Sequence, residues 1–222
     1  MQAARETGMT LLELMVGLVV LAVMLAFGAA TLGRWSDDQR AASSARDVAD
    51  AFALARAEAL RSGSNHIVAF DVESGLSGIS SDIVIVDDGA PANADCRIDS
   101  DEIVHRISLG RGVSFGTDAG LANGTPAPDD DGDSGNQAAG ASFTDADSPA
   151  GDASWVVFMS DGLPRRFSQN ATAVPPCSDV GPVGDAGGAI YLTNGNRDYG
   201  VVLSPLGSAR VHRWINGSGW TQ

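Results

Sequence analysis

Lysine is absent from this sequence, and all fourteen of its basic residues are arginines. Acidic residues outnumber them, 28 to 14, which gives a formal net charge of −14. Residues 71–152 contain seventeen acids and three arginines, whereas the chain from residue 153 onward contains four acids and five arginines. Because phosphate binding needs clustered cations, the acidic middle is a poor surface for nucleic acid, whereas the C-terminal part is permissive.

Aromatic residues and cysteines are also scarce. Aromatic side chains make up 6% of the chain, against 27 glycines and 44% hydrophobic residues. This composition favours a loop-rich β domain over a helical bundle, and 222 residues suffice for one such domain plus a long accessory element. The two cysteines, Cys96 and Cys177, could form one disulfide in an oxidising compartment or remain two separate thiols.

The N-terminal segment between Met9 and Gly33 carries a single ionisable side chain, Glu13. As a helix it would span roughly 37 Å, enough to cross a bilayer. A secretory signal peptide has a shorter apolar run that ends at a cleavage site, which this segment lacks. A carboxylate in lipid costs on the order of 3 kcal/mol, so Glu13 requires a partner or a function. In an ordinary signal anchor it would instead reach the headgroups.

The next segment continues the helix but is amphipathic. Residues 36–62 contain neither proline nor glycine, and Gly63 suits a helix end. Apolar residues recur at alternating spacings of four and three and form one stripe: Ala41, Ala45, Val48, Phe52, Ala55 and Ala59. We therefore predict one helix from about Met9 to Arg61, whose second half lies on another element.

Beyond Gly63 the pattern changes to short apolar runs separated by Gly, Asn, Asp and Pro, which is typical of antiparallel strands. The predicted strands are 65–72, 82–88, 102–109, 112–115, 154–160, 164–168, 189–193, 199–204 and 209–215. They predict an α+β fold, in which an antiparallel sheet covers the amphipathic half of the helix and buries Val48, Phe52 and Ala55.

The start of the chain carries a specific pattern. A short polar leader ends at Gly8, and Met9-Thr10-Leu11-Leu12-Glu13 then opens the apolar helix. This pattern resembles the prepilin-type N-terminus of type IV pilins and type II secretion pseudopilins. The resemblance implies that prepilin peptidase cuts between Gly8 and Met9 and methylates the new N-terminus. It also implies that Glu13 pairs with the N-terminal amine of a neighbouring subunit, which would compensate the buried charge.

Two further stretches narrow the resemblance. Residues 53–63, followed at once by a strand, and residues 199–214 resemble the GspH/FimT group of minor pseudopilins and minor pilins. Met9 departs from the phenylalanine that is common at the first mature position. Ala30 stands where many major pilins carry a helix-kinking proline, which favours a minor subunit.

The same group includes members that are linked to DNA uptake through a Gly-Arg-x-Arg motif near the C-terminus. Gly207 and Arg210 match this motif, Ser208 replaces its first arginine, and Arg213 could replace that arginine in part. Against the acidic background we expect solvated arginines on an edge strand, and we do not expect nucleic acid as a partner.

The acidic middle contains one calcium-like pattern. Asp129, Asp131 and Asp133 alternate as the first ligands of a calcium loop do, but Ser134 and Gly140 stand where an EF-hand needs Gly and Glu. We therefore expect a flexible acidic loop and no cofactor, with calcium as the alternative; residues 95–102 form a second, weaker candidate. No catalytic motif is present, so we predict that the protein is not an enzyme.

These inferences, together with the resemblance, predict four parts. They are a leader (1–8), a transmembrane half-helix (9–33), an amphipathic half-helix (34–62) and a periplasmic β-rich domain (63–222) with an acidic insertion at about 117–152. The resemblance places the N-terminus in the cytoplasm and the chain in the bacterial inner membrane.

The function that follows from the resemblance is that of a minor pseudopilin, which initiates or caps the periplasmic pseudopilus of a type II secretion system. The implied partners are other pseudopilins or pilins along the N-terminal helix, prepilin peptidase and the inner-membrane assembly platform. Two alternatives stay open: a minor pilin of a type IV pilus, with or without a part in DNA uptake, and a membrane-anchored periplasmic binding domain outside the filament class.

Overall fold

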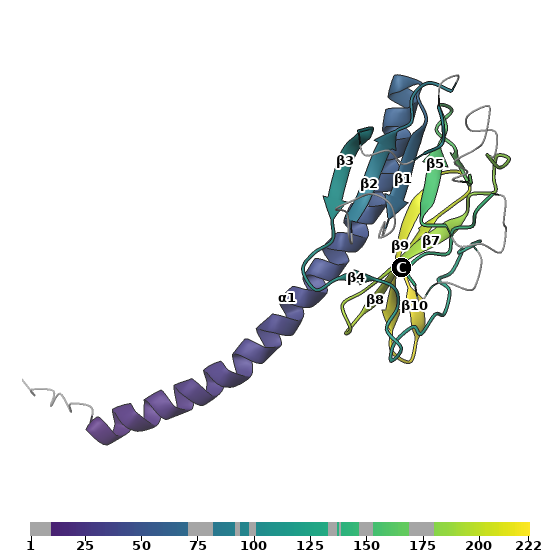
Figure 1. Cartoon of the computed structure of the whole chain (residues 1–222). Helices are drawn as coiled ribbons and strands as arrows, with labels where there is room; N and C mark the ends of the chain where they lie inside the picture. Colours follow the sequence, from purple (N-terminus) through teal and green to yellow (C-terminus); the bar gives the residue numbers. More distant parts are fainter. Residues whose placement is uncertain are drawn as a thin grey trace, which may run out of the picture. The chain divides into compact units, whose positions relative to one another are not determined.

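The computed structural model describes residues 10–70, 82–91, 94–97, 101–132, 137, 139–146, 153–168 and 180–222. The chain divides into two compact units, Met1–Asp37 and Asp38–Gln222. The described residues form one helix, α1 (Leu11–Ser62), and ten strands (Figure 1). The strands are β1 (His66–Phe70), β2 (Asp82–Asp87), β3 (Ile103–Ser108), β4 (Ser114–Phe115), β5 (Trp155–Phe158), β6 (Pro164–Arg165), β7 (Gly188–Thr193), β8 (Asp198–Leu203), β9 (Ala209–Ile215) and β10 (Gly219–Thr221).

The predicted helix, from about Met9 to Arg61, agrees closely with α1, which runs from Leu11 to Ser62 without a break. In the first unit, the described leucines, valines and methionines from Leu11 to Leu25 are exposed. Within the described part of the chain, no helix combines the length and the apolar character needed to cross a membrane. The assignment of residues 9–33 as a transmembrane half-helix therefore stays a prediction.

The strands of the second unit form two antiparallel sheets, not the one sheet that we predicted. One has the order β3-β2-β1-β5-β6 and the other the order β10-β9-β8-β7-β4. The two predicted strands at 102–109 and 112–115 thus fall in different sheets, because β4 pairs with β7 far along the chain. The tenth strand, β10, was not predicted. It follows a tight turn in which Gly217 and Gly219 have φ of 81° and 80°, a conformation that favours glycine.

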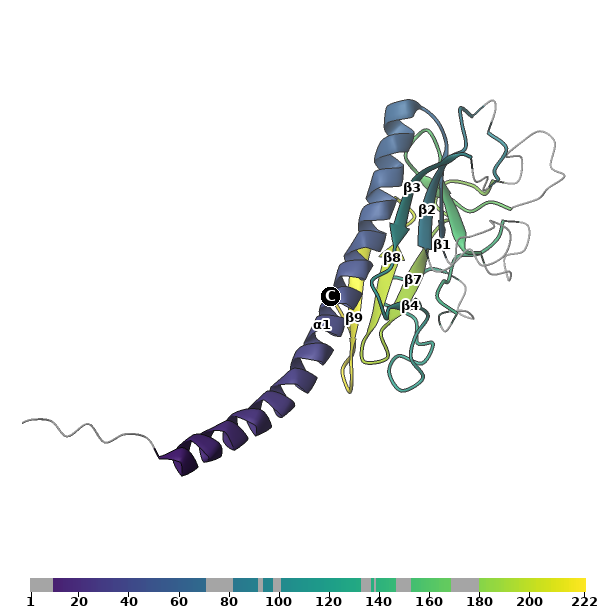
Figure 2. The ribbon, with the colours of Figure 1, turned by 60° about the vertical axis from the view of Figure 1, so that its left-hand side comes forward.

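The second half of α1 runs alongside the strands of both sheets (Figure 2). Its apolar stripe belongs to the main core, together with residues of both sheets. Val48, Phe52 and Ala55 are fully buried, as predicted. The ring centroid of Phe52 lies 6.2 Å from that of Phe143 and 6.3 Å from that of Phe158. Burial of these side chains stabilises the domain by about 1.5–3 kcal/mol for each large one, which fixes this half of the helix to the sheets.

Each sheet also buries its second face. On the first sheet a second apolar cluster includes Ile67, Val84 and Phe167, and on the other sheet a third cluster is centred on Tyr191. The central strands β1 and β8 are therefore buried along their whole length, which explains why their sequences are nearly continuous apolar runs.

The described residues of the acidic insertion pack against the second sheet, and in this part they differ from the free loop that we expected. The carboxylate of Asp198 on β8 is fully buried and accepts hydrogen bonds from the backbone N–H groups of Asp118 and Ala122. From its composition we expected this segment to be solvated. The composition could not reveal the contact with Asp198, because Asp198 lies about 80 residues further along the chain.

Candidate functional site

The first turn of α1 holds the described part of the processing and assembly motif; Gly8 and Met9 lie outside the described residues. The backbone N–H and the hydroxyl of Thr10 each donate to Glu13 Oε2 at 3.3 Å. In return, the backbone N–H of Glu13 donates to Thr10 Oγ1 at 3.2 Å. These reciprocal bonds form a capping box, which satisfies N–H groups that would otherwise lack partners at the helix start.

The capping box gives Glu13 a role within its own chain that we did not predict, although the Thr-x-x-Glu spacing is visible in the sequence. Both hydrogen bonds from Thr10 use the same carboxylate oxygen, Oε2. Glu13 Oε1 accepts no hydrogen bond from a described residue. The carboxylate can therefore cap its own helix through one oxygen and accept an external cation through the other.

Arg210, which matches the DNA-uptake motif, and Arg213, which could replace its missing arginine in part, lie on opposite faces of β9. Arg210 Nη1 donates to Asp129 Oδ2 at 3.2 Å, and both side chains are more than half exposed. Arg213, three residues further along the strand, lines a pocket with Ala42 and Arg46 of α1. Successive strand residues alternate between faces, so Arg210 and Arg213 do not form one cationic surface.

The central contact of the acidic loop comes from Asp130, a residue that we did not single out. Its carboxylate accepts hydrogen bonds from the Tyr191 hydroxyl at 2.5 Å and from Ser142 Oγ at 2.6 Å. The Tyr191 hydroxyl in turn accepts a hydrogen bond from the Ala127 N–H at 2.9 Å. Burial, and then the charge of Asp130, raise the pKa of Tyr191, so this phenol stays protonated as a donor.

Two of the three predicted calcium ligands, Asp129 and Asp131, are described, and both line one pocket beside Arg210. Asp129 pairs with Arg210, and Asp131 lines a pocket of about 180 Å³ that Asp129 and Arg210 also line. Asp133 lies outside the described residues. A calcium site formed by the three aspartates therefore stays a prediction.

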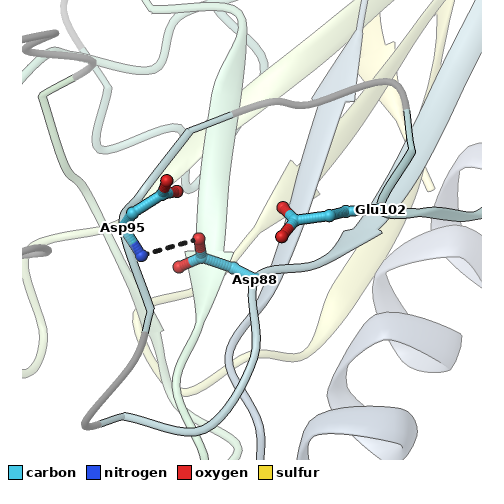
Figure 3. Close-up of side chains that lie close together, drawn as sticks. All are labelled: Asp88, Asp95 and Glu102. Carbon is cyan, nitrogen blue, oxygen red and sulfur yellow. Dashed lines mark hydrogen bonds between the residues drawn. The ribbon is translucent and has the colours of Figure 1, made fainter.

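Three carboxylates of the first sheet's loops lie close together (Figure 3). One oxygen from each of Asp88, Asp95 and Glu102 falls within 4.8 Å of the others. Asp88 is almost fully buried, and its Oδ1 accepts hydrogen bonds from the backbone N–H groups of Asp95, at 3.1 Å, and Cys96, at 2.9 Å. Burial raises the pKa of Asp88 to about 7, because these two hydrogen bonds only partly compensate the lost hydration.

This trio could supply oxygen ligands to a hard divalent cation such as Ca²⁺, although three carboxylates alone do not define a site. Asp95 and Glu102 belong to the stretch that we named as the weaker calcium candidate. Asp88 was missed because it ends a predicted strand, and only the turn back toward β3 brings it near the others. Cys96 is disulfide-bonded. Its predicted partner, Cys177, lies outside the described residues, so this pairing stays a prediction.

Comparison with known proteins supports the N-terminal pattern. Residues 3–29 match the family model of the prokaryotic N-terminal methylation motif. No curated protein matches the chain at a significant level. Among solved structures, the chain is similar to the minor pseudopilin EpsH from the Type 2 Secretion System of Vibrio cholerae, with 14% identity and a TM-score of 0.38 over 78% of this chain and 95% of that chain.

The motif match confirms that this chain has a prepilin-type N-terminus. It is followed by a long helix and an antiparallel two-sheet domain, which confirms the predicted α+β class. The likeness to EpsH is too distant to carry an argument of its own. The choice of filament system therefore rests on the sequence resemblance, because the N-terminal motif with Glu13 is common to both systems.

Proposed function

We propose that this chain is a minor pseudopilin of a type II secretion system, a structural subunit that initiates or caps a periplasmic pseudopilus. The observation that carries the proposal is the methylation motif at residues 3–29, in which Glu13 stands five residues after Gly8. No catalytic constellation is required for this function, because the subunit acts through its contacts with other subunits.

Glu13 sets the axial position of the subunit in this account. Cleavage between Gly8 and Met9 creates a new amine at the start of each mature helix. A neighbour's amine binds Glu13 Oε1 while Oε2 keeps its bonds to Thr10. A charge surrounded by apolar helices is unfavourable unless an opposite charge lies beside it. A subunit that is shifted along the filament axis would leave Glu13 and the amine unpaired, and its assembly would be less favourable.

The environment of the two units follows from the same proposal. The apolar segment of α1 lies among other subunits or in the inner membrane, with the uncut N-terminus in the cytoplasm. The two-sheet domain lies in the periplasm. The disulfide at Cys96 supports this placement, because disulfides persist in oxidising compartments. Prepilin peptidase, the inner-membrane assembly platform and other pseudopilins are the partners.

A minor pilin of a type IV pilus is the second candidate, because the same N-terminal motif serves both filaments. The ion pair between Arg210 and Asp129 does not favour a part in DNA uptake. A membrane-anchored binding domain outside the filament class is the third candidate. Such a protein would not need a prepilin cleavage site between Gly8 and Met9.

Complementation of a deletion strain with matched variants tests the proposal. Glu13→Gln removes the charge but keeps a capping-box side chain, whereas Thr10→Ala removes the cap and keeps the charge. We expect Glu13→Gln to abolish export of secretion substrates and Thr10→Ala to retain most of it. Loss of pilus extension or retraction with normal export would favour the type IV pilus. Full activity of Glu13→Gln in both assays would contradict a filament role.

A further inference from the structure

A pocket of about 340 Å³ opens on the second unit, away from the acidic loop and the carboxylate trio. Its lining comes from α1, β8, β9 and the end of the chain, through Ala42, Arg46, Tyr199, Val211, Arg213 and Gln222. Its apolar residues are Ala42 and Val211, and its polar residues are Arg46, Arg213, Tyr199 and Gln222.

The two arginines of the pocket are exposed, and neither guanidinium makes a hydrogen bond or an ion pair with a described residue. Most other arginines of this unit have partners: Arg56 with the Gly207 carbonyl, Arg61 with Glu58, Arg165 with Asp161, Arg166 with Asp185, Arg197 with Asp38 and Arg210 with Asp129. In a chain with twice as many acids as bases, two adjacent unneutralised arginines are unusual and leave a local positive field.

Tyr199 supplies the third polar group. Its side chain is 6% exposed, and its hydroxyl makes no hydrogen bond to a described residue. Burial raises the pKa of this hydroxyl. The charges of Arg197, Arg213 and Arg46 oppose the rise, and the charge of Asp38 adds to it. Arg46, Arg213 and Tyr199 line the same pocket, and the phenol stays protonated and can donate.

We propose that Arg46, Arg213 and Tyr199 bind a carboxylate group presented by an acidic segment of a partner protein. A guanidinium donates two parallel hydrogen bonds to a carboxylate, and charge-assisted bonds of this kind are about twice as strong as neutral ones. Ala42 and Val211, the apolar residues of the same lining, contact the methylene carbons of an aspartate or glutamate side chain. In the filament the partner is the neighbouring subunit; this clause alone rests on the proposed function.

A phosphate-bearing ligand is less compatible with the same surface. Nucleic acid requires a run of cations along its backbone, and the third arginine of this region, Arg210, faces the other side of β9 and pairs with Asp129. Arg197 is likewise neutralised, by Asp38. Two guanidinium groups and a phenol match a single carboxylate better than a polyphosphate chain.

The full-length protein in detergent micelles, with a fluorescein-labelled hexaglutamate peptide as the probe, tests the site by fluorescence polarisation in about 50 mM salt. We expect Arg46→Ala combined with Arg213→Ala to weaken binding by about tenfold or more. Tyr199→Phe should weaken it by about two- to tenfold, the effect of one hydrogen bond. The matched control is Arg106→Ala combined with Arg111→Ala, which removes two exposed arginines elsewhere and should change affinity less than about twofold.

If both double variants lose the same affinity for the peptide, the effect is one of net charge, and the proposed site is wrong. Unchanged binding in the Arg46 and Arg213 double variant would overturn it as well. Inorganic phosphate or duplex DNA that binds more tightly than the peptide, with the same sensitivity to the variants, would overturn the carboxylate assignment. These results do not depend on processing at Met9, so failure of the site and failure of the proposed function are distinguishable.

Discussion

Arg210 Nη1 lies 3.2 Å from Asp129 Oδ2, and this ion pair joins two residues whose sequence patterns pointed to different ligands. Arg210 matched a DNA-uptake motif, and Asp129 headed a calcium-like run. In the structure each neutralises the other across β9 and the acidic loop. Local sequence patterns could not show this, because the two residues are 81 positions apart.

The first prediction concerns DNA. We expect no salt-dependent shift of duplex DNA by the full-length protein, even at about 50 mM salt, and no difference for Arg210→Ala combined with Arg213→Ala. The reason is that one arginine is paired and the other lies on the opposite face of the strand. A shift that the double variant abolishes would contradict this account and support a role in DNA uptake.

The second prediction concerns the hydroxyl of Tyr191. Tyr191→Phe leaves Asp130 and the Ala127 N–H without their buried partner, and we expect the free energy of unfolding to fall by about 1–3 kcal/mol. Tyr199→Phe is the matched control, because its hydroxyl has no partner among the described residues, and it should change stability by less than about 0.5 kcal/mol. Chemical denaturation of both variants measures the difference, and equal losses would contradict the assigned network.

The third prediction concerns the ion pair between Asp38 and Arg197, whose Oδ2 and Nε lie 2.6 Å apart. Burial alone would raise the pKa of Asp38, but the hydrogen bonds from Arg197 and Asn194 hold it below its usual value. Both side chains are partly exposed, so Asp38→Asn should cost only about 1 kcal/mol at pH 7.

The pH dependence of this effect has a definite sign. A depressed carboxyl pKa stabilises the fold above its unfolded value, near 4, and this contribution is lost as the pH falls through the lower folded value. Unfolding curves of the wild type and Asp38→Asn should therefore converge at low pH. Asp50→Asn, an exposed change on the same helix, should show no such trend. A constant difference down to acid pH would disprove the assignment.

The fourth prediction concerns Asp88, whose pKa is raised to about 7 by burial. A raised carboxyl pKa contributes stability that is fully present below about pH 4 and is lost as the pH rises through about 7. We expect the melting temperature of the wild type to fall over this range relative to that of Asp88→Asn, which cannot ionise. Thermal melts in metal-free buffer from pH 5 to pH 8 measure the slope. Parallel slopes would contradict a buried, protonated Asp88.

The sequence predicted the features of this fold that depend on neighbouring residues. The spacing of Ala45, Val48 and Phe52 identified the buried stripe of α1, and alternating apolar runs located nine of the strands close to their observed positions. The Thr-x-x-Glu spacing of the capping box at Thr10 and Glu13 was equally visible in the sequence. We missed it because we interpreted Glu13 only as a carboxylate in the membrane that needs a partner.

Features that depend on distant pairing could not be predicted in this way. Whether β4 joins β3 or β7 is decided by packing across nearly 80 residues, so the second sheet was missed. The same is true of Asp88, Asp130 and Asp198, whose carboxylates gain their roles only when the fold brings N–H or O–H donors from other segments to them. In an acidic chain most carboxylates are solvated, and composition does not distinguish the few that hold the loops.

Mass spectrometry of the N-terminal peptide tests the central claim most directly. The protein should be purified from membranes of cells with and without active prepilin peptidase. The account predicts a peptide that begins at N-methylated Met9 when the peptidase is active, and one that retains Gly8 and the leader when it is not. A leader that stays attached in the presence of active peptidase would contradict the filament pathway and leave Glu13 as the cap of an ordinary anchor helix.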